Sequence, residues 1–214
     1  MKKIKISTLT LFVLITFTSY SQSHWVIGVG TNVVSDNGGR FSKLLNFNSY
    51  NYVPYFSTLS VAREMTYGFT AEAIGNYNKL WQGKLVNGQY NSHSSSNYFS
   101  VDLLLKYDFH YFLKDKKWYV LPLAMIGGGY SDRGIETPNY SDLNHSNKTG
   151  SPTFDLGVGA KFVIYKRFGA VYQSLAKFVV GDKTSSNHVQ HVLTITYALP
   201  SHKRMFLLRK TGRF

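Results

Sequence analysis

Apolar and polar residues alternate along the stretch from Phe154 to Ile164. Every second position is apolar: Phe154, Leu156, Val158, Ala160, Phe162 and Ile164. The intervening positions are Asp155, Gly157, Gly159, Lys161 and Val163, most of them polar or glycine. A period of two residues places these sets on opposite faces of a β-strand. In a soluble sheet the apolar face would be the core. In an outer-membrane barrel it would contact lipid, with Asp155 and Lys161 directed into the barrel. The alternation alone does not decide between the two arrangements.

Eight segments of the chain have this strand-like character. They cover residues 24–34, 54–64, 67–77, 97–109, 117–130, 154–165, 168–180 and 187–199. In the fifth segment we expect Leu121, Leu123 and Met125 to lie on the outer face. Pro122 is expected to cause a local bulge there, because proline has no N–H to donate to a neighbouring strand. In the seventh segment the alternation leaves the face of Lys177 open.

Long and short connections alternate between these segments. Long polar connections occupy about residues 35–52, 78–96 and 131–151, and very short ones lie at 64–66 and 165–167. The connections at 110–117 and 181–187 are of moderate length. Outer-membrane barrels have this layout, with short periplasmic turns, long extracellular loops and both termini in the periplasm. The sequence therefore predicts an all-β fold, namely an eight-stranded antiparallel transmembrane up-and-down β-barrel.

The N-terminal residues have the features of a secretory signal peptide. A basic start, Lys2–Lys5, precedes an apolar stretch at about residues 6–17, and cleavage is expected after Ser21. That stretch is shorter than the about 20 apolar residues of a membrane-spanning helix. We therefore expect a signal peptide at 1–21, the barrel at 22–199 and a basic periplasmic tail at 200–214.

Composition narrows the classes of function. The chain has 16% charged and 16% aromatic residues, which argues against disorder, and no cysteine, which excludes a disulfide scaffold. The net charge of +13 falls to +10 without the three signal lysines, and five basic residues lie in the tail, at Lys203, Arg204, Arg209, Lys210 and Arg213. They suit contact with an anionic membrane surface or a protein partner; the alternative is a disordered remnant. An exported chain is not expected to bind nucleic acid.

Charged residues inside the predicted strands form the main candidate site. They are Glu72, Asp102, Lys106, Asp155, Lys161 and Lys177. A lysine near the middle of the lipid face would cost about 2–4 kcal/mol, so we expect these side chains in the lumen. An unpaired buried ion costs several kcal/mol, so they must pair. We interpret them as a salt-bridge network that braces the barrel, and the competing interpretation is a gate that rearranges to pass ions or small solutes.

No catalytic, metal or cofactor site is evident in the sequence. It has no nucleophile elbow, no His-Glu-x-x-His motif and no Gly-rich phosphate loop. His188 and His191 should point to opposite faces of one strand near the outer rim, which prevents both from binding one metal. The glycine run at 126–130 is expected to make room for a large residue across the lumen. One connection contains acidic residues and a histidine without regular calcium-ligand spacing, at Asp132, Glu136, Asp142 and His145, and is interpreted as a solvated loop.

Three stretches resemble the N-terminal barrel domain of OmpA-type outer-membrane proteins, in the form common in Bacteroidota. They are LSVAREMTYGFTAEAIGNYNKL (59–80), NYFSVDLLLKYDF (97–109) and FGAVYQSLAKFVVGDKTSSNHVQHVLTITYAL (168–199). The resemblance implies a barrel of the porin family in a Gram-negative outer membrane. Longer members continue into a peptidoglycan-binding domain, which we expect this chain to lack.

We therefore expect a non-enzymatic outer-membrane protein with a mainly structural role. A small gated pore and surface loops for adhesion or partner contact are further expected roles. Two other classes stay open: an outer-membrane enzyme acting at the barrel rim, and a secreted soluble barrel that binds a ligand inside. Membrane lipid is the expected partner, no cofactor is expected, and the sequence does not determine the oligomeric state.

Overall fold

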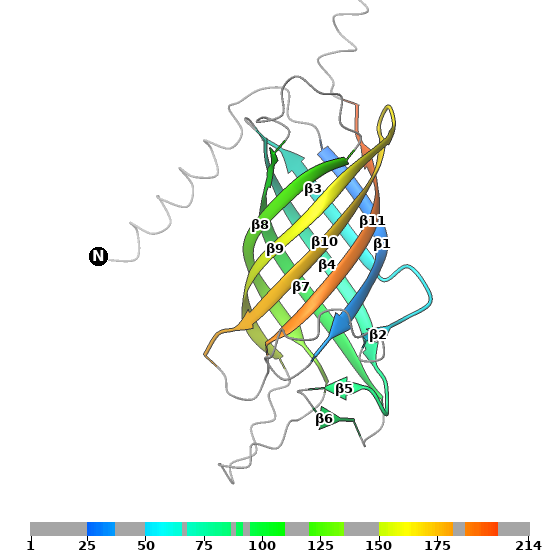
Figure 1. Ribbon diagram of the computed structural model, residues 1–214, viewed down its shortest axis with the longest axis vertical. Coiled ribbons are helices and arrows are strands. Elements are labelled where there is room, and N and C mark those ends of the chain that lie inside the picture. The colour runs from blue at the N-terminus through cyan, green and yellow to red at the C-terminus, as the bar shows by residue number, and fades with distance from the viewer. Residues whose placement is uncertain are drawn as a thin grey trace, which may run out of the picture. The chain divides into compact units, whose positions relative to one another are not determined.

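Eight long strands follow one another around a closed barrel in the order of the chain (Figure 1). They are β1 (Trp25–Ser35), β3 (Thr58–Glu64), β4 (Phe69–Leu80), β7 (Ser96–Asp108), β8 (Val120–Asp132), β9 (Gly150–Tyr165), β10 (Phe168–Val179) and β11 (His188–Ala198). Neighbouring strands pair antiparallel, and β11 pairs with β1 to close the sheet. The predicted eight-stranded antiparallel barrel is thus confirmed.

The computed structural model describes residues 25–36, 50–65, 68–86, 89–91, 95–109, 120–134, 150–181 and 187–200. The barrel is one compact unit, Trp25–Leu199. The predicted signal peptide lies outside the described residues, as does the basic tail apart from Pro200. In the described part of the chain, no helix has both the length and the apolar character needed to cross a membrane.

The two ends of the barrel differ in their connections. Three short strands lie at one end (Figure 1): β2 (Tyr50–Tyr52), which pairs with β1, and the hairpin of β5 (Leu85–Val86) with β6 (Gln89–Tyr90). We call this the loop end. The opposite end, the turn end, carries the tight β9–β10 turn and both ends of the barrel unit, where the Leu199 amide donates to the Trp25 carbonyl at 2.7 Å.

Large apolar side chains cover the outside of the barrel, with at least one exposed on every long strand. They include Trp25, Ile27, Val29, Leu59, Val61, Phe69, Phe99, Val101, Leu103, Leu105, Val120, Ile126, Phe154, Leu156, Val158, Phe162, Ile164, Phe168, Tyr172, Leu193 and Ile195. In β9, where apolar and polar residues alternate, the apolar set faces outward and Asp155 is fully buried. The pleat sends alternate side chains to opposite faces, so the apolar residues of the alternation lie together on the outside.

The orientation expected for β8 was wrong. Leu121, Leu123 and Met125 are buried, whereas Val120 and Ile126 are exposed. Pairing with β9 explains the orientation, since directly paired residues lie on the same face and Ile126 pairs with the outward Leu156. Both faces of this part of β8 are apolar, so its own alternation could not distinguish them.

Pro122 does not produce the expected bulge. The register of β8 with β9 runs without a shift through the Pro122–Ala160 pair, and the ladder with β7 ends at Leu123. Proline is tolerated where a ladder to one neighbour has ended. An irregularity lies instead between β9 and β10, where the register shifts at Phe168 and Gly169.

Candidate functional site in the barrel lumen

The six charged residues predicted for the lumen all have partners there or at its rim. Glu72, Asp102, Lys106, Asp155 and Lys177 are buried, and Lys161 is about one third exposed near the turn end. They form ion pairs between different strands, at two levels of the lumen and at its rim. These side chains are thus paired, whereas their role in bracing the barrel stays a hypothesis.

Lys177 is the centre of the pairing nearer the loop end. Its Nζ lies 2.5 Å from Oδ1 of Asp102 and 3.5 Å from Oδ2 of Asp155, so one ammonium on β10 serves carboxylates on β7 and β9. The Ser100 hydroxyl donates to Oδ2 of Asp102 at 3.2 Å. All three charged side chains have no exposed surface, so their interaction is weakly screened by solvent.

Two glycines of β8 allow β7 to carry Asp102 into this group. A Cβ at Gly129 would collide with Oδ1 of Asp102 and with the Val101 carbonyl, and a Cβ at Gly127 would collide with the Leu103 carbonyl. The expectation of a large residue across the lumen was therefore wrong, because the glycines accommodate the adjacent strand.

A second pairing lies nearer the turn end. Lys106 of β7 forms an ion pair with Glu72 of β4, and Gln173 of β10 donates to Oε2 of Glu72 at 3.1 Å. At the rim of the turn end, Lys161 Nζ lies 3.0 Å from Oε1 of Glu64. Glu64 could not be identified from the sequence, because it stands at a strand end beside a short turn, where a charged residue usually faces solvent.

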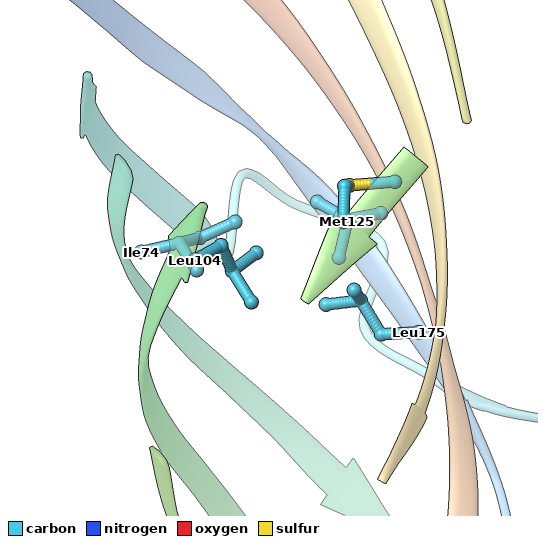
Figure 2. Close-up of a cluster of buried hydrophobic side chains, with 5 residues drawn as sticks. Ile74, Leu104, Met125 and Leu175 are labelled. Atoms are coloured by element: carbon cyan, nitrogen blue, oxygen red, sulfur yellow. The ribbon is translucent and has the colours of Figure 1, made fainter. Parts of the chain in front are cut away.

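An apolar layer separates the two buried charge groups. Figure 2 shows Ile74 and Leu104 directed toward Met125 and Leu175, and Val192 completes the buried cluster. On β7 Leu104 lies between Asp102 and Lys106, and on β10 Leu175 lies between Gln173 and Lys177. The lumen is therefore filled in successive layers, polar, apolar and polar, as expected for a barrel of eight strands.

A polar cap closes the loop end of the lumen. We give this name to four buried residues: Asp36, Tyr98, Arg133 and His188. Arg133 Nη1 donates to Oδ2 of Asp36 at 2.6 Å, Arg133 Nη2 lies 2.9 Å from His188 Nδ1, and His188 Nε2 lies 2.9 Å from the Tyr98 hydroxyl. Arginine has no acceptor, so Nδ1 of His188 accepts and its proton resides on Nε2. This assignment makes the imidazole neutral.

Each member of the polar cap lies next to a different connection at the loop end. Asp36 directly follows β1, Arg133 directly follows β8, Tyr98 is the third residue of β7, and His188 begins β11. The cap thus ties together the bases of four connections. Sequence reasoning missed it because polar residues near loops are common and no local spacing relates these four.

The two histidines point to opposite faces, as expected, but His188 is inside the lumen and not at an exposed rim. His191 faces outward, with its Nδ1 2.9 Å from the Tyr172 hydroxyl and its Nε2 3.5 Å from the Tyr50 hydroxyl. Burial raises the pKa of Tyr50, with a further contribution from Tyr172, so the phenol keeps its proton.

The acidic connection contributes little to the described structure. Asp132 ends β8, where its Oδ1 accepts from the Gly134 amide at 2.9 Å, and Glu136, Asp142 and His145 lie outside the described residues. Across the described ranges, no group of three or more histidine or acidic side chains is placed to hold a metal ion.

Arg133→Ala should loosen the connections at the loop end. The substitution leaves the Asp36 carboxylate and His188 without the guanidinium that joins them, so we expect limited proteolysis in the long connections to accelerate several-fold. Mapping the cleavage sites by mass spectrometry would measure this. Arg63→Ala is the matched control, because Arg63 stacks 5.5 Å over the Trp25 ring at the turn end. An unchanged cleavage pattern in Arg133→Ala would contradict a role for the cap.

No protein-family model matches the chain, and no curated protein matches it. Solved structures similar to it include the N-terminal β-barrel domain of Pseudomonas aeruginosa OprF (12% identity, TM-score 0.46, 83% of this chain and 100% of that one). The Yersinia pestis outer membrane protein Ail in a phospholipid bilayer nanodisc is 12% identical with a TM-score of 0.46, and the match covers 83% of this chain and 100% of Ail. Neisserial surface protein A is 14% identical with a TM-score of 0.47, and the match covers 84% of this chain and 97% of that protein. These similarities are low, and the assignment of the chain as an eight-stranded antiparallel β-barrel rests on its own strand pairing.

Proposed function

We propose that the chain is an outer-membrane β-barrel protein with a mainly structural role. The observation that carries the proposal is the reversed distribution of side chains. Leu103 and Val158 are each 66% exposed on the outside, whereas Asp155 and Lys177 are 0% exposed in the lumen. Water-soluble monomers rarely expose apolar patches beyond a few hundred Å², but lipid solvates such a surface. The band around all eight strands therefore favours a membrane over a soluble location.

The secreted soluble barrel is the less favourable alternative. That reading requires the alternating charges of β9 to face water, but Asp155 is buried against Lys177 and Lys161 pairs with Glu64 at the rim. It also requires an apolar interior along β9, where the inward positions are Asp155, Gly157 and Gly159.

A closed lumen supports a structural role over conduction. The apolar layer crosses the lumen between the two buried charge groups, and each buried lysine is already paired. We propose that the barrel acts without catalysis, that its termini are periplasmic and that the long connections offer surface for adhesion or partner contact. On this proposal the purified protein should give no steady conductance in planar bilayers and no hydrolysis of lipid or peptide substrates.

Fractionation of cells that express the chain tests the membrane assignment. We expect the protein in the outer-membrane fraction, released only by detergent, because its apolar band needs lipid or a detergent micelle. Unheated samples should migrate differently from boiled ones on a denaturing gel, since a closed barrel resists unfolding by the detergent. Recovery from the periplasm without detergent would overturn the proposal.

A further inference from the structure

The end of the β9–β10 hairpin departs from the alternation of the barrel wall. Phe162, Val163, Ile164 and Tyr165 are consecutive, and their exposed fractions are 37%, 43%, 64% and 61%. Elsewhere in β9, no two neighbouring residues are both exposed, because every second side chain points into the lumen. Figure 1 shows this hairpin reaching beyond neighbouring strands at the turn end. We call residues 162–168 the hairpin tip.

Two exposed basic residues form the turn of the hairpin tip. Lys166 and Arg167 connect Tyr165 to its paired residue Phe168, and Lys166 Nζ lies 4.9 Å over the Tyr165 ring. Lys166 has φ +42°, in a region that glycine adopts at lower cost. Turns of two residues with positive φ at the first position favour glycine there. The chain thus has Lys166 at a position where the turn geometry alone would favour glycine.

The hairpin tip is held in place by β11. The Ala198 amide donates to the Arg167 carbonyl at 2.9 Å, and the Phe168 ring lies 4.9 Å from the Tyr197 ring. A basic, aromatic turn is therefore presented by an ordered element at one end of the apolar band.

The charge at the turn end is also predominantly basic. Among the described residues there, Arg63, Lys161, Lys166 and Arg167 are basic, whereas Glu64, which pairs with Lys161, and Asp108 are acidic, so basic residues outnumber acidic ones by four to two. Anionic headgroups attract such residues by about 1 kcal/mol for each lysine or arginine near the surface. Arginine in addition binds phosphate through two parallel N–H donors.

We propose that the hairpin tip binds the headgroup phosphate of anionic phospholipids in the leaflet at the turn end. Ile164, Tyr165 and Phe168 lie at the boundary between acyl chains and headgroups, and Lys166 and Arg167 contact the phosphates. This inference rests on the proposed membrane location. The apolar band contacts acyl chains and by itself has no preference for one headgroup, whereas the hairpin tip would prefer anionic ones.

Spin-labelled lipids measure this preference directly. The protein is reconstituted in phosphatidylcholine bilayers, and the motionally restricted fraction is compared for spin-labelled phosphatidylglycerol and phosphatidylcholine. We expect phosphatidylglycerol to associate about fivefold more strongly, which corresponds to about one basic residue at a membrane surface, and 0.5 M salt, roughly a 4 Å screening length, to suppress the preference.

The variant Lys166→Gly/Arg167→Asn removes both charges while placing glycine at the position of positive φ, so the turn should fold at least as well. We expect it to lose the preference for phosphatidylglycerol. Lys79→Gln/Lys84→Gln removes two lysines from the loop end and should keep it. Equal association of the two lipids with the wild-type protein, or a preference that survives in Lys166→Gly/Arg167→Asn, would overturn the inference. Absence of any motionally restricted lipid would instead contradict the membrane location.

Discussion

Lys177→Met should lower the free energy of unfolding by about 3–5 kcal/mol, the usual cost of removing one partner from a buried ion pair. Methionine occupies a similar volume but leaves the carboxylates of Asp102 and Asp155 facing each other without a cation in a layer that has no exposed surface. Denaturant titration of the reconstituted protein, followed by the change in gel mobility, would measure the difference.

A triple variant separates lost pairing from lost packing. Lys177→Met combined with Asp102→Asn and Asp155→Asn removes all three charges at nearly constant volume, and buried ion pairs replaced in this way are often no less stable than before. We expect most of the lost stability to return. Lys79→Met, at a partly exposed position over the Trp81 ring, is the matched single control and should have a small effect. Equal stability of Lys177→Met and wild type would show that the lumen pairing does not brace the barrel.

Leu103→Lys should destabilise the protein in bilayers by about 2–4 kcal/mol, the cost of a lysine near the membrane midplane on the lipid face. Leu103 lies near the middle of β7 and is 66% exposed. The same substitution on a water-facing strand would be nearly neutral, since surface changes away from special features are usually within about 0.5 kcal/mol. Unfolding in lipid vesicles therefore tests which solvent surrounds the band.

Two further variants test whether the destabilisation by Leu103→Lys depends on the added charge and on its depth in the membrane. Leu103→Ala removes the same side chain without adding charge and should cost less than Leu103→Lys. Tyr130→Lys, near the end of β8 at the loop end, should cost only about 0–1 kcal/mol, as expected close to the membrane interface. Similar, small effects for Leu103→Lys and Tyr130→Lys would indicate that the band does not face lipid.

The long strands were largely predictable because their evidence is local. From Phe154 to Phe162 of β9 each large apolar residue has a polar or glycine neighbour, so Phe154 and Asp155 were assigned to opposite faces and lie there. The structure begins that strand earlier, at Gly150, because pairing with β8 extends to Asp132. In β8, Leu121 and Val120 are both apolar, so periodicity carries no information about which faces the lumen. There the pairing with β9 sets the orientation.

The lumen site was predictable in kind but not in its pairs. Charge at an inward position indicates that a partner must exist, and Glu72, Asp102, Lys106, Asp155 and Lys177 all have one. The partners Lys177 and Asp102 are 75 residues apart, and the polar cap joins Arg133 to Asp36 across 97 residues. No local spacing links such residues, and loops contain many other acidic and basic side chains that could have served.

Periodicity, connection length and composition are properties of short stretches, so the amino-acid sequence was enough to specify strands, most of their faces and the polar character of the lumen. The pairing of the charges, the apolar layer between them, the four-residue cap and the projection of the hairpin tip depend on how strands are offset when the sheet closes. That offset is set by the shear of the whole barrel and by contacts between strands distant in sequence. A one-residue change in register would exchange the inner and outer faces of a strand. Pairing within the β9–β10 hairpin already places Lys177 beside Asp155, and only the closed barrel brings Asp102 of β7 to the same lysine.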